Sequence, residues 1–214
     1  MLAVVSAVLD EISPLVGLLK ARPDEREGCF LFEGKNQKIL LAPLGVSFLK
    51  AGLEFQSLLY QFPGIKEVLF VGTAGFYGLD NKTRIWDLCL AEEVFLIDGA
   101  AEMGLAKYAK FMEKTGIHST LRCDWGLNKT KIATTLGMTI NPGLSGRIAQ
   151  NTGAEIENME LYSVAALCQE KEIFWNALLG ITNKVGPEAH RQWTENHLGV
   201  QKKACELLFQ QFTK

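Results

Sequence analysis

The chain has 214 residues, of which 48% are hydrophobic and 21% charged, with a formal net charge of −2 and a pI near 6.0. This balance predicts one globular domain over residues 1–214 and excludes a disordered chain. It offers no basic surface that would attract nucleic acid, and no stretch of ~18 uncharged apolar residues that would span a membrane.

The cysteines are odd in number and widely spaced, without a Cys-x-x-Cys pair or a histidine at metal-ligand spacing. This arrangement favours reduced thiols in a cytoplasmic protein. We therefore expect no disulfide, no metal and no cofactor. The five cysteines are Cys29, Cys89, Cys123, Cys168 and Cys205.

Apolar runs alternate with amphipathic stretches, which is typical of a sheet covered by helices. The apolar residues 2–8 lack a preceding basic segment and predict a buried first strand rather than a leader. The other predicted elements, in chain order, are a helix over 11–21, a hairpin of 29–33 and 37–42 around Gly34-Lys35-Asn36, a helix within 45–62, strands over 68–71 and 88–97, a strand over 135–140 followed by a turn at Asn141-Pro142-Gly143, a strand-to-helix segment over 156–170, a strand over 177–182 and a closing helix over 191–212. Residues 100–130 predict no clear element.

Small residues, Gly72-Thr73-Ala74-Gly75, follow the strand over 68–71. Glycines let backbone N–H groups approach a ligand closely, and Thr73 adds a hydroxyl. A plain tight turn between a strand and a loop is the alternative, since short glycine motifs are common.

Glu157-Asn158-Met159-Glu160 stands at a predicted strand-to-helix junction. The helix dipole favours a carboxylate there whether or not it binds anything, by ~0.3–1 kcal/mol. Alternatively, Glu160 binds a vicinal diol such as the ribose 2′ and 3′ hydroxyls, because a carboxylate has two acceptor oxygens and no donor.

Two further polar side chains follow predicted strands. Asn183 ends the strand over 177–182, and ligands of open α/β sheets bind at the carboxyl ends of strands; a turn or capping role is the alternative. Glu11 follows the first strand and could act as a general base or simply stabilise a helix start. His118, His190 and His197 share no metal or triad spacing and are predicted to be surface or capping residues, and Trp193 a packing residue that could also contact a ligand.

Taken in order along the chain, these segments resemble the superfamily of purine nucleoside phosphorylases and nucleosidases, which includes methylthioadenosine/S-adenosylhomocysteine nucleosidases and futalosine hydrolases. Met159-Glu160 and its 23-residue distance to Asn183 carry most of the resemblance. It implies a three-layer α/β/α sandwich with a central mixed sheet.

The resemblance also implies roles for seven residues. Glu11 matches the carboxylate that activates water and Asn183 the residue that contacts the purine N7, which makes both candidate catalytic residues. The residues implied to bind substrate are Thr73, Ala74, Gly75, Met159 and Glu160. The side chain that stacks on the base is not evident, and Met138 and Ile140 are the candidates.

Asn183 bears on which purine is used. An Asp there suits the 6-amino group of adenine, whereas an Asn can donate its NH₂ to a 6-oxo group and accept from a protonated N7. The stretch Asn183-Lys184-Val185-Gly186-Pro187, followed by Trp193, also resembles the futalosine hydrolases. We therefore expect hydrolysis of futalosine, which would belong to menaquinone synthesis.

Other functions stay open at this point. The few arginines lie away from Gly45 and from Gly72–Gly75, which favours hydrolysis over phosphorolysis. The alternatives are an adenosine-type nucleosidase, a phosphorylase, or a nucleoside-binding protein without catalysis. The resemblance further implies a homo-oligomer, a dimer or larger; the 5′ group of the substrate is not determined.

Overall fold

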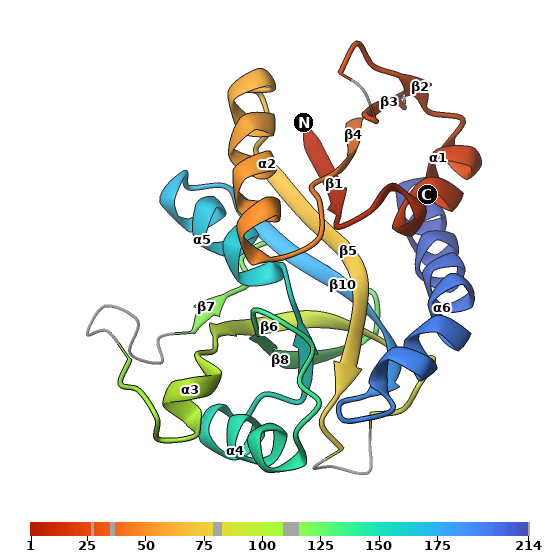
Figure 1. Ribbon diagram of the computed structural model, residues 1–214. Helices are drawn as coiled ribbons and strands as arrows, with labels where there is room; N and C mark the ends of the chain where they lie inside the picture. Colours follow the sequence, from red (N-terminus) through yellow and green to blue (C-terminus); the bar gives the residue numbers. More distant parts are fainter. Residues whose placement is uncertain (27, 35–36, 79–82, 109–115, 214) are drawn as a thin grey trace.

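A computed structural model describes residues 1–26, 28–34, 37–78, 83–108 and 116–213 (Figure 1). Its described strands form one ten-stranded mixed sheet. They are β1 (Leu2–Ser6), β2 (Arg22–Pro23), β3 (Phe30–Glu33), β4 (Lys38–Pro43), β5 (Glu67–Phe76), β6 (Leu88–Leu96), β7 (Ile117–His118), β8 (Asn128–Thr134), β9 (Ile156–Asn158) and β10 (Phe174–Lys184).

The centre of the sheet is parallel. β1 lies between β4 and β5, and β5 also pairs with β10, all in the same direction. β9 runs antiparallel to β5, and β6 antiparallel to β10. Because β8 joins β6 to β9, the strands β5, β9, β8, β6 and β10 form a closed circuit, from which β1, β4, β3 and β2 extend.

Helices cover both faces of this sheet, as the sequence predicts (Figure 1). α1 packs with α6 on one side, and α2 packs with α5 on the other. α3 and α4 pack together beside the closed part of the sheet. The described helices are the 3₁₀ helix η1 (Leu9–Glu11), α1 (Ser13–Leu19), α2 (Phe48–Gln61), α3 (Gly99–Glu102), α4 (Pro142–Thr152), α5 (Leu161–Glu170) and α6 (Ala189–Phe212).

The side chains of β1 point alternately to the two faces of the sheet and so join two separate hydrophobic clusters. Ala3 and Val5 join the cluster that contains α2 and α5, whereas Leu2 and Val4 join the cluster that contains α1 and α6. Successive residues of a strand point to opposite faces, so a strand that is apolar at every position must be covered on both. The prediction of a buried first strand is confirmed.

The strand predicted over 68–71 extends further than expected, and neither a loop nor a turn follows at Gly72–Gly75. These residues continue β5 and pair with Leu179 to Asn183 of β10, with a register irregularity near the end. Short glycine-rich runs resemble turns in a sequence, but here the distant strand β10 pairs with all four residues, and β9 pairs with Gly75 on the other side. The absence of bulky side chains therefore opens space on the sheet rather than reversing the chain.

The predicted strand over 135–140 and the turn after it are also wrong. The strand, β8, ends at Thr134, and the chain is irregular until α4 begins at Pro142. Asn141 caps α4 through a hydrogen bond from the Leu144 N–H to its Oδ1 (3.0 Å). Asn-Pro is a turn signal that also starts helices, because proline is tolerated in the first turn.

Other predicted elements are confirmed with shifted ends. β3 and β4 form the predicted hairpin, although residues 35 and 36 of its turn lie outside the described part of the chain. The helix expected over 11–21 divides into η1 and α1. Within the described residues, none of the helices has the length and apolar character needed to cross a bilayer.

Candidate active site

A cavity of about 320 Å³ opens where the parallel strands β1, β5 and β10 end, the place where ligands bind open α/β sheets. It brings together all seven residues that the sequence singles out as catalytic or substrate-binding. These are Glu11, Thr73, Ala74, Gly75, Met159, Glu160 and Asn183.

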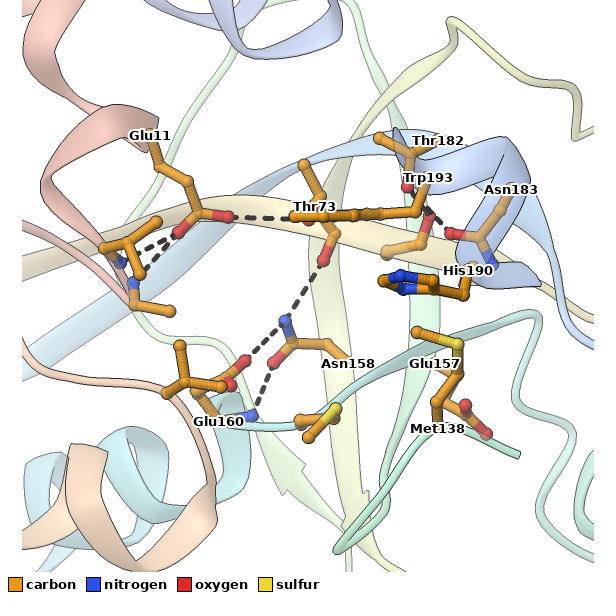
Figure 2. A pocket seen from close by; sticks show the side chains of 16 residues that line it. Glu11, Thr73, Met138, Glu157, Asn158, Glu160, Thr182, Asn183, His190 and Trp193 are labelled. Atoms are coloured by element: carbon orange, nitrogen blue, oxygen red, sulfur yellow. Dashed lines mark hydrogen bonds between the residues drawn. The ribbon is translucent and has the colours of Figure 1, made fainter. Parts of the chain in front are cut away.

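The cavity has two ends (Figure 2). Glu11 and Glu160 lie at one, which we call the Glu11 end, and Asn183, Glu157, Met138 and His190 lie at the other, which we call the Asn183 end. Thr73 and Asn158 lie between them. A ligand that fills the cavity therefore meets different chemistry at its two ends.

Glu11 is fixed by the backbone of the loop that precedes it. The N–H groups of Ala7 and Val8 donate to Oε2 of Glu11, at 3.0 and 3.4 Å. The Thr73 hydroxyl donates to Oε1 at 3.4 Å. Because only Ala7 and Val8 separate β1 from η1, their N–H groups lie close enough to bind this carboxylate.

The surroundings raise the pKa of Glu11 to about 7. The larger cause is burial, which disfavours the charged form, and the second is the negative charge of Glu160. The backbone N–H groups act in the opposite direction because they stabilise the carboxylate. A carboxyl group with a pKa near neutrality can both take up and release a proton at physiological pH.

Thr73 links Glu11 to α6. The indole N–H of Trp193 donates to Oγ1 of Thr73 at 3.2 Å, and Thr73 in turn donates to Glu11. Trp193 stacks on His197, with ring centroids 4.2 Å apart. Trp193 and the exposed His190 both line the cavity. The sequence predicts only a surface or capping role for His190 and mainly a packing role for Trp193.

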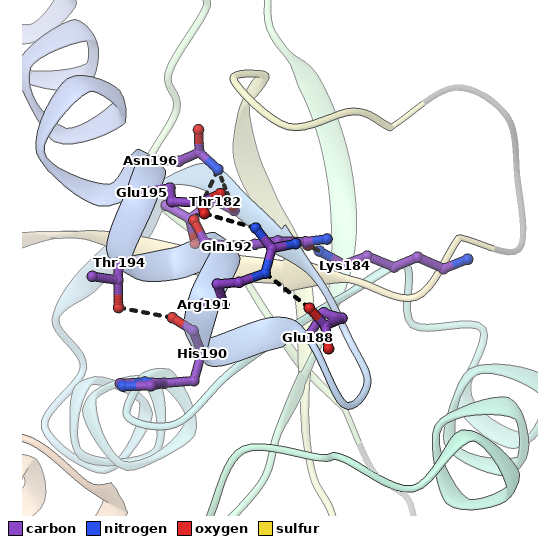
Figure 3. A network of polar contacts seen from close by, with 9 residues as sticks. All are labelled: Thr182, Lys184, Glu188, His190, Arg191, Gln192, Thr194, Glu195 and Asn196. Atoms are coloured by element: carbon purple, nitrogen blue, oxygen red, sulfur yellow. Dashed lines mark hydrogen bonds and ion pairs between the residues drawn. The ribbon is translucent and has the colours of Figure 1, made fainter.

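Two contacts attach the start of α6 to the end of β10 (Figure 3). The Lys184 N–H donates to Oε1 of Gln192 at 2.8 Å, and Nδ2 of Asn196 donates to the Thr182 carbonyl at 3.0 Å. These bonds hold Trp193 and Asn183 on neighbouring elements in a fixed relation. The same region carries Arg191, which is exposed and paired with Glu188 and Glu195.

Asn158 organises the start of α5. Its Oδ1 accepts hydrogen bonds from the N–H groups of Glu160 and Leu161, at 2.9 and 2.8 Å. These bonds cap the N-terminus of α5. Its Nδ2 donates to Oε2 of Glu160 and to the Thr73 carbonyl, both at 3.2 Å. Asn158 has no predicted role, although an Asn before a helical segment is a capping signal.

A second donor reaches the Glu160 carboxylate from the residue that precedes α2. The Ser47 N–H donates to Oε1 of Glu160 at 3.0 Å. Ser47 has φ = 94° and ψ = 152°, a region almost reserved for glycine that costs a residue with a side chain on the order of 1–3 kcal/mol. A carboxylate accepts about four hydrogen bonds, and Ser47, Asn158 and the Met159 backbone donate to that of Glu160, so an acceptor position is left for a ligand. Burial raises its pKa.

Asn183 is held by its neighbours in the chain. The Thr182 hydroxyl donates to Oδ1 at 2.8 Å, and Nδ2 donates to the Lys184 carbonyl at 3.3 Å. This leaves one N–H and one oxygen lone pair of the amide for a ligand. A Cβ on Gly75 would lie 2.6 Å from Nδ2, so only glycine leaves room for the amide.

Three carboxyl side chains line the cavity, those of Glu11, Glu157 and Glu160. Among the described residues that line it, none is a lysine or an arginine. The described residues also contain no group of three or more His, Cys, Asp or Glu side chains that could hold a metal ion. The cavity therefore favours a ligand on which positive charge develops.

The family model described as the phosphorylase superfamily matches residues 1–213. The chain belongs to this superfamily. A comparison with curated proteins finds no match.

Solved structures of the same fold cover almost the whole of this member of the superfamily. A futalosine hydrolase mutant of Helicobacter pylori strain 26695 has a TM-score of 0.81 and 20% identity, covering 97% of this chain and 96% of its own. A 5′-methylthioadenosine/S-adenosylhomocysteine nucleosidase of Helicobacter pylori has a TM-score of 0.82 and 19% identity, covering 97% and 95%. A putative nucleosidase of the latter kind from Francisella philomiragia has a TM-score of 0.83 and 16% identity, covering 100% and 98%. At these identities the likeness shows the fold.

Proposed function

We propose that this protein hydrolyses the N-glycosidic bond of a 6-oxopurine nucleoside, with futalosine as the first candidate. One observation carries the proposal: Glu11, with a pKa of about 7, and Glu160 share one end of a cavity whose other end holds the Asn183 amide. The cavity therefore brings together a general base that activates water, Glu11, a carboxylate that binds the ribose hydroxyls, Glu160, and an amide that stabilises the leaving purine, Asn183.

The reaction begins with stretching of the bond between C1′ and N9. The electron pair of that bond moves into the purine, and positive charge develops on the sugar as an oxocarbenium-like state. Glu160 accepts hydrogen bonds from the ribose hydroxyls through the positions that Ser47 and Asn158 leave free. Its negative charge stabilises the developing cation.

Water then attacks C1′ and gives a proton to Glu11. Ala7, Val8 and Thr73 hold this carboxylate in one orientation, so it need not reorganise during the step. A positioned general base contributes roughly 10²–10⁴-fold to the rate. The new C1′–O bond replaces the C1′–N9 bond, and the purine leaves with a proton on N7 that is taken from solvent.

Asn183 stabilises the purine as it takes up the electron pair. The free N–H of its amide donates to O6, and the carbonyl oxygen accepts from protonated N7. The choice of a 6-oxopurine rests on this pattern. Futalosine in particular rests on the resemblance of Asn183–Pro187 and Trp193 to futalosine hydrolases.

The charge of the cavity supports hydrolysis over phosphorolysis. A phosphate ion would have to enter beside Glu11 and Glu160, and the described lining residues offer no cation to bind it. Arg191, on the neighbouring helix α6, is already paired with two glutamates. Water carries no charge and meets no such repulsion.

We also propose a homo-oligomer in the cytoplasm. Val46 lines the cavity and is 54% exposed, and Leu49 and Leu53, 67% and 59% exposed, continue an apolar stripe along α2. A second copy that covers this stripe would also reach the edge of the cavity. Light scattering coupled to size-exclusion chromatography measures the oligomeric state directly, and a monomer at micromolar concentration would refute the proposed homo-oligomer.

The experiment that tests the function is a base-release assay with futalosine, inosine and methylthioadenosine. Hypoxanthine release from futalosine that exceeds adenine release from methylthioadenosine is the expected result. Faster adenine release would make this chain an adenosine-type nucleosidase. Binding of these nucleosides without release of any base would indicate a non-catalytic binding protein.

A further inference from the structure

The hydroxyl of Thr73 lies between Trp193 of α6 and Glu11 of η1 (Figure 2). Its Oγ1 is 3.2 Å from the indole nitrogen of Trp193 and 3.4 Å from Oε1 of Glu11. An indole N–H can only donate a hydrogen bond, so the hydroxyl oxygen must accept from Trp193. The single hydroxyl proton of Thr73 then remains for Glu11, which only accepts hydrogen bonds when it is ionised.

The direction of this proton matters because the contact with Glu11 is long. Most O–H···O hydrogen bonds measure about 2.5–3.0 Å, so a bond over 3.4 Å depends on a proton that points straight at the carboxylate. A hydroxyl rotates to suit its surroundings unless a second contact holds it. A hydroxyl that already accepts a hydrogen bond is also polarised into a better donor. The Trp193 N–H therefore strengthens the bond from Thr73 to Glu11.

The same bond distinguishes the two protonation states of Glu11. An ionised carboxylate accepts the Thr73 proton, whereas a proton on Oε1 would place two hydrogens between the same pair of oxygens. The Thr73 hydroxyl would then have to turn away, against the contact that Trp193 makes with it. A Thr73 hydroxyl that is held as a donor thus favours the ionised form.

Trp193 is kept in this orientation by its own helix. The ring of His197, one turn later in α6, stacks on the indole with centroids 4.2 Å apart and planes 14° apart. Nδ1 of His197 lies 3.0 and 3.1 Å from the carbonyl oxygens of Trp193 and Thr194, and two acceptors require that this nitrogen carry a hydrogen. The imidazole is fixed by these carbonyls, and the indole packs against it.

The other donors to the Glu11 carboxylate come from the backbone. The N–H groups of Ala7 and Val8 donate to Oε2, and the Thr73 N–H also stabilises the charged form. These donors stay in every variant that keeps the backbone. Removing the indole N–H of Trp193 therefore weakens one contact of Glu11 and leaves the others in place.

We propose that Trp193 is a positioning residue whose indole N–H holds the Thr73 hydroxyl as a donor to Glu11 and thereby favours the ionised carboxylate. The inference rests on the proposed function for the role of Glu11 as the base that activates water. In this role Trp193 acts through Thr73 rather than on the reacting atoms. It couples the closing helix of the chain to the Glu11 end of the cavity.

Other ionisable groups also face Glu11. The negative charge of Glu160, at the start of α5, raises the pKa of Glu11. Cys205 of α6 donates from Sγ to the Glu11 carbonyl at 3.3 Å. The remaining groups are Asp10, next to Glu11 in η1, and His190 and His197, which stack on Trp193. Trp193→Phe removes none of these groups and keeps an aromatic ring for the histidines, so its effect on Glu11 reports the indole N–H.

The test is the pKa of Glu11, measured without substrate by ¹³C NMR of protein labelled at the glutamate carboxyl carbons and assigned with Glu11→Gln. In Trp193→Phe this pKa should rise from about 7 to roughly 7.5–8, because a hydrogen bond to the carboxylate is weakened. Trp86→Phe is the matched control. The indole N–H of Trp86 donates to Asn196 of the same helix at 3.2 Å, and its loss should leave the Glu11 pKa unchanged.

The rate of the proposed reaction gives a second readout. Because Glu11 acts in its ionised form, Trp193→Phe should lower kcat/KM roughly three- to tenfold at pH 6 and less than about twofold at pH 9, where both proteins are ionised. A merely structural role of Trp193 would lower the rate at every pH. Thr73→Val, which removes the hydroxyl, should raise the Glu11 pKa at least as much, and adding Trp193→Phe to it should raise the pKa no further.

Four results would overturn the inference. The first is an unchanged Glu11 pKa in Trp193→Phe, and the second is an equal rise in Trp86→Phe. The third is a double variant in which the two rises add, which would mean that Trp193 does not act through Thr73. The fourth is an unchanged Glu11 pKa in Thr73→Val, a variant that leaves the indole in place.

The NMR measurement needs no substrate, so its outcome is separate from that of the hydrolysis assay. Base release together with an unchanged Glu11 pKa in Trp193→Phe would remove the inference and leave the function. A raised Glu11 pKa in Trp193→Phe, in a protein that releases no base, would keep the positioning role of Trp193 and remove the proposed function.

Discussion

The two ends of the cavity depend on the backbone to different degrees. At the Glu11 end, the backbone N–H groups of Ala7, Val8 and Ser47 donate to the carboxylates of Glu11 and Glu160, and the Thr73 and Asn158 side chains add one hydrogen bond each. At the Asn183 end, the Thr139 N–H donates to Glu157, and the Tyr77 and Thr182 hydroxyls donate to Glu157 and Asn183. A side-chain donor can be replaced by mutation, whereas every residue except proline keeps its backbone N–H. The Glu11 end is therefore held more by the backbone of the fold, and the Asn183 end more by side chains that can change.

The largest effect should follow from Glu11→Gln. The amide keeps the size of the side chain but cannot take a proton from water, so kcat should fall by roughly 10²–10⁴-fold. KM should change little because the ribose and base contacts remain. Steady-state kinetics with the best substrate measure both constants. Glu67→Gln, at the exposed start of β5, is the matched control and should behave like the unaltered protein; a near-normal kcat for Glu11→Gln would contradict the role of this end.

The dependence of kcat/KM on pH should report the ionisation of Glu11. Glu11 must be ionised to act as a base, and its pKa is raised to about 7, so kcat/KM should rise with pH below 7 and level off above it. The expected slope is about tenfold per pH unit, or roughly 10²-fold between pH 5 and 7. Initial rates across this range provide the measurement. A flat profile down to pH 5 would show that no carboxyl with a raised pKa limits the rate.

Glu160→Gln should lower kcat/KM more for ribonucleosides than for 2′-deoxynucleosides. Losing hydrogen bonds to a charged acceptor costs about 1.5–3 kcal/mol, or roughly 10–100-fold in kcat/KM for a ribonucleoside. A 2′-deoxynucleoside already lacks one of these bonds and should lose less. The ratio of inosine to 2′-deoxyinosine turnover gives the answer, and an equal loss for both would place Glu160 away from the diol.

Asn183→Asp should change the base and leave the sugar preference as it is. A carboxylate beside O6 repels its lone pairs, whereas a 6-amino group can donate to it. Relative kcat/KM should move toward methylthioadenosine by roughly tenfold or more, given 1–3 kcal/mol for a base contact. Competition between inosine and adenosine in one reaction measures the shift. Unchanged selectivity would remove Asn183 from base recognition.

The Glu11 end could be predicted from the sequence and much of the Asn183 end could not. Glu11 comes shortly after β1 and Glu160 shortly after β9, so a local pattern places both near strand ends. Asn183 lies within β10, one residue before its end. The position of Glu157 depends on the register of β9 against β5. Met138, one of the two side chains that the resemblance offers for stacking on the base, lines the cavity from an irregular segment where the sequence predicts a strand. Neither the register nor the irregular path can be worked out from neighbouring residues.

The errors in the fold have the same origin. Glycine is common in turns, so the sequence of Gly72–Gly75 favours a turn, yet β10 pairs with all four residues and β9 with Gly75. The sequence predicts no helix where α4 forms, because Pro142 and the polar residues that follow it are typical of a loop. Buried apolar runs such as β1 and the second half of β10 were found, since their burial shows in their composition.

The most direct test of the account is the identity of the sugar product, found by mass spectrometry of reactions with futalosine in phosphate-free buffer and in excess phosphate. If Glu11 directs water to C1′ in a cavity whose described lining residues include no lysine or arginine, the free sugar product, dehypoxanthine futalosine, should form at the same rate in both. Formation of a sugar 1-phosphate, or cleavage only when phosphate is present, would contradict it.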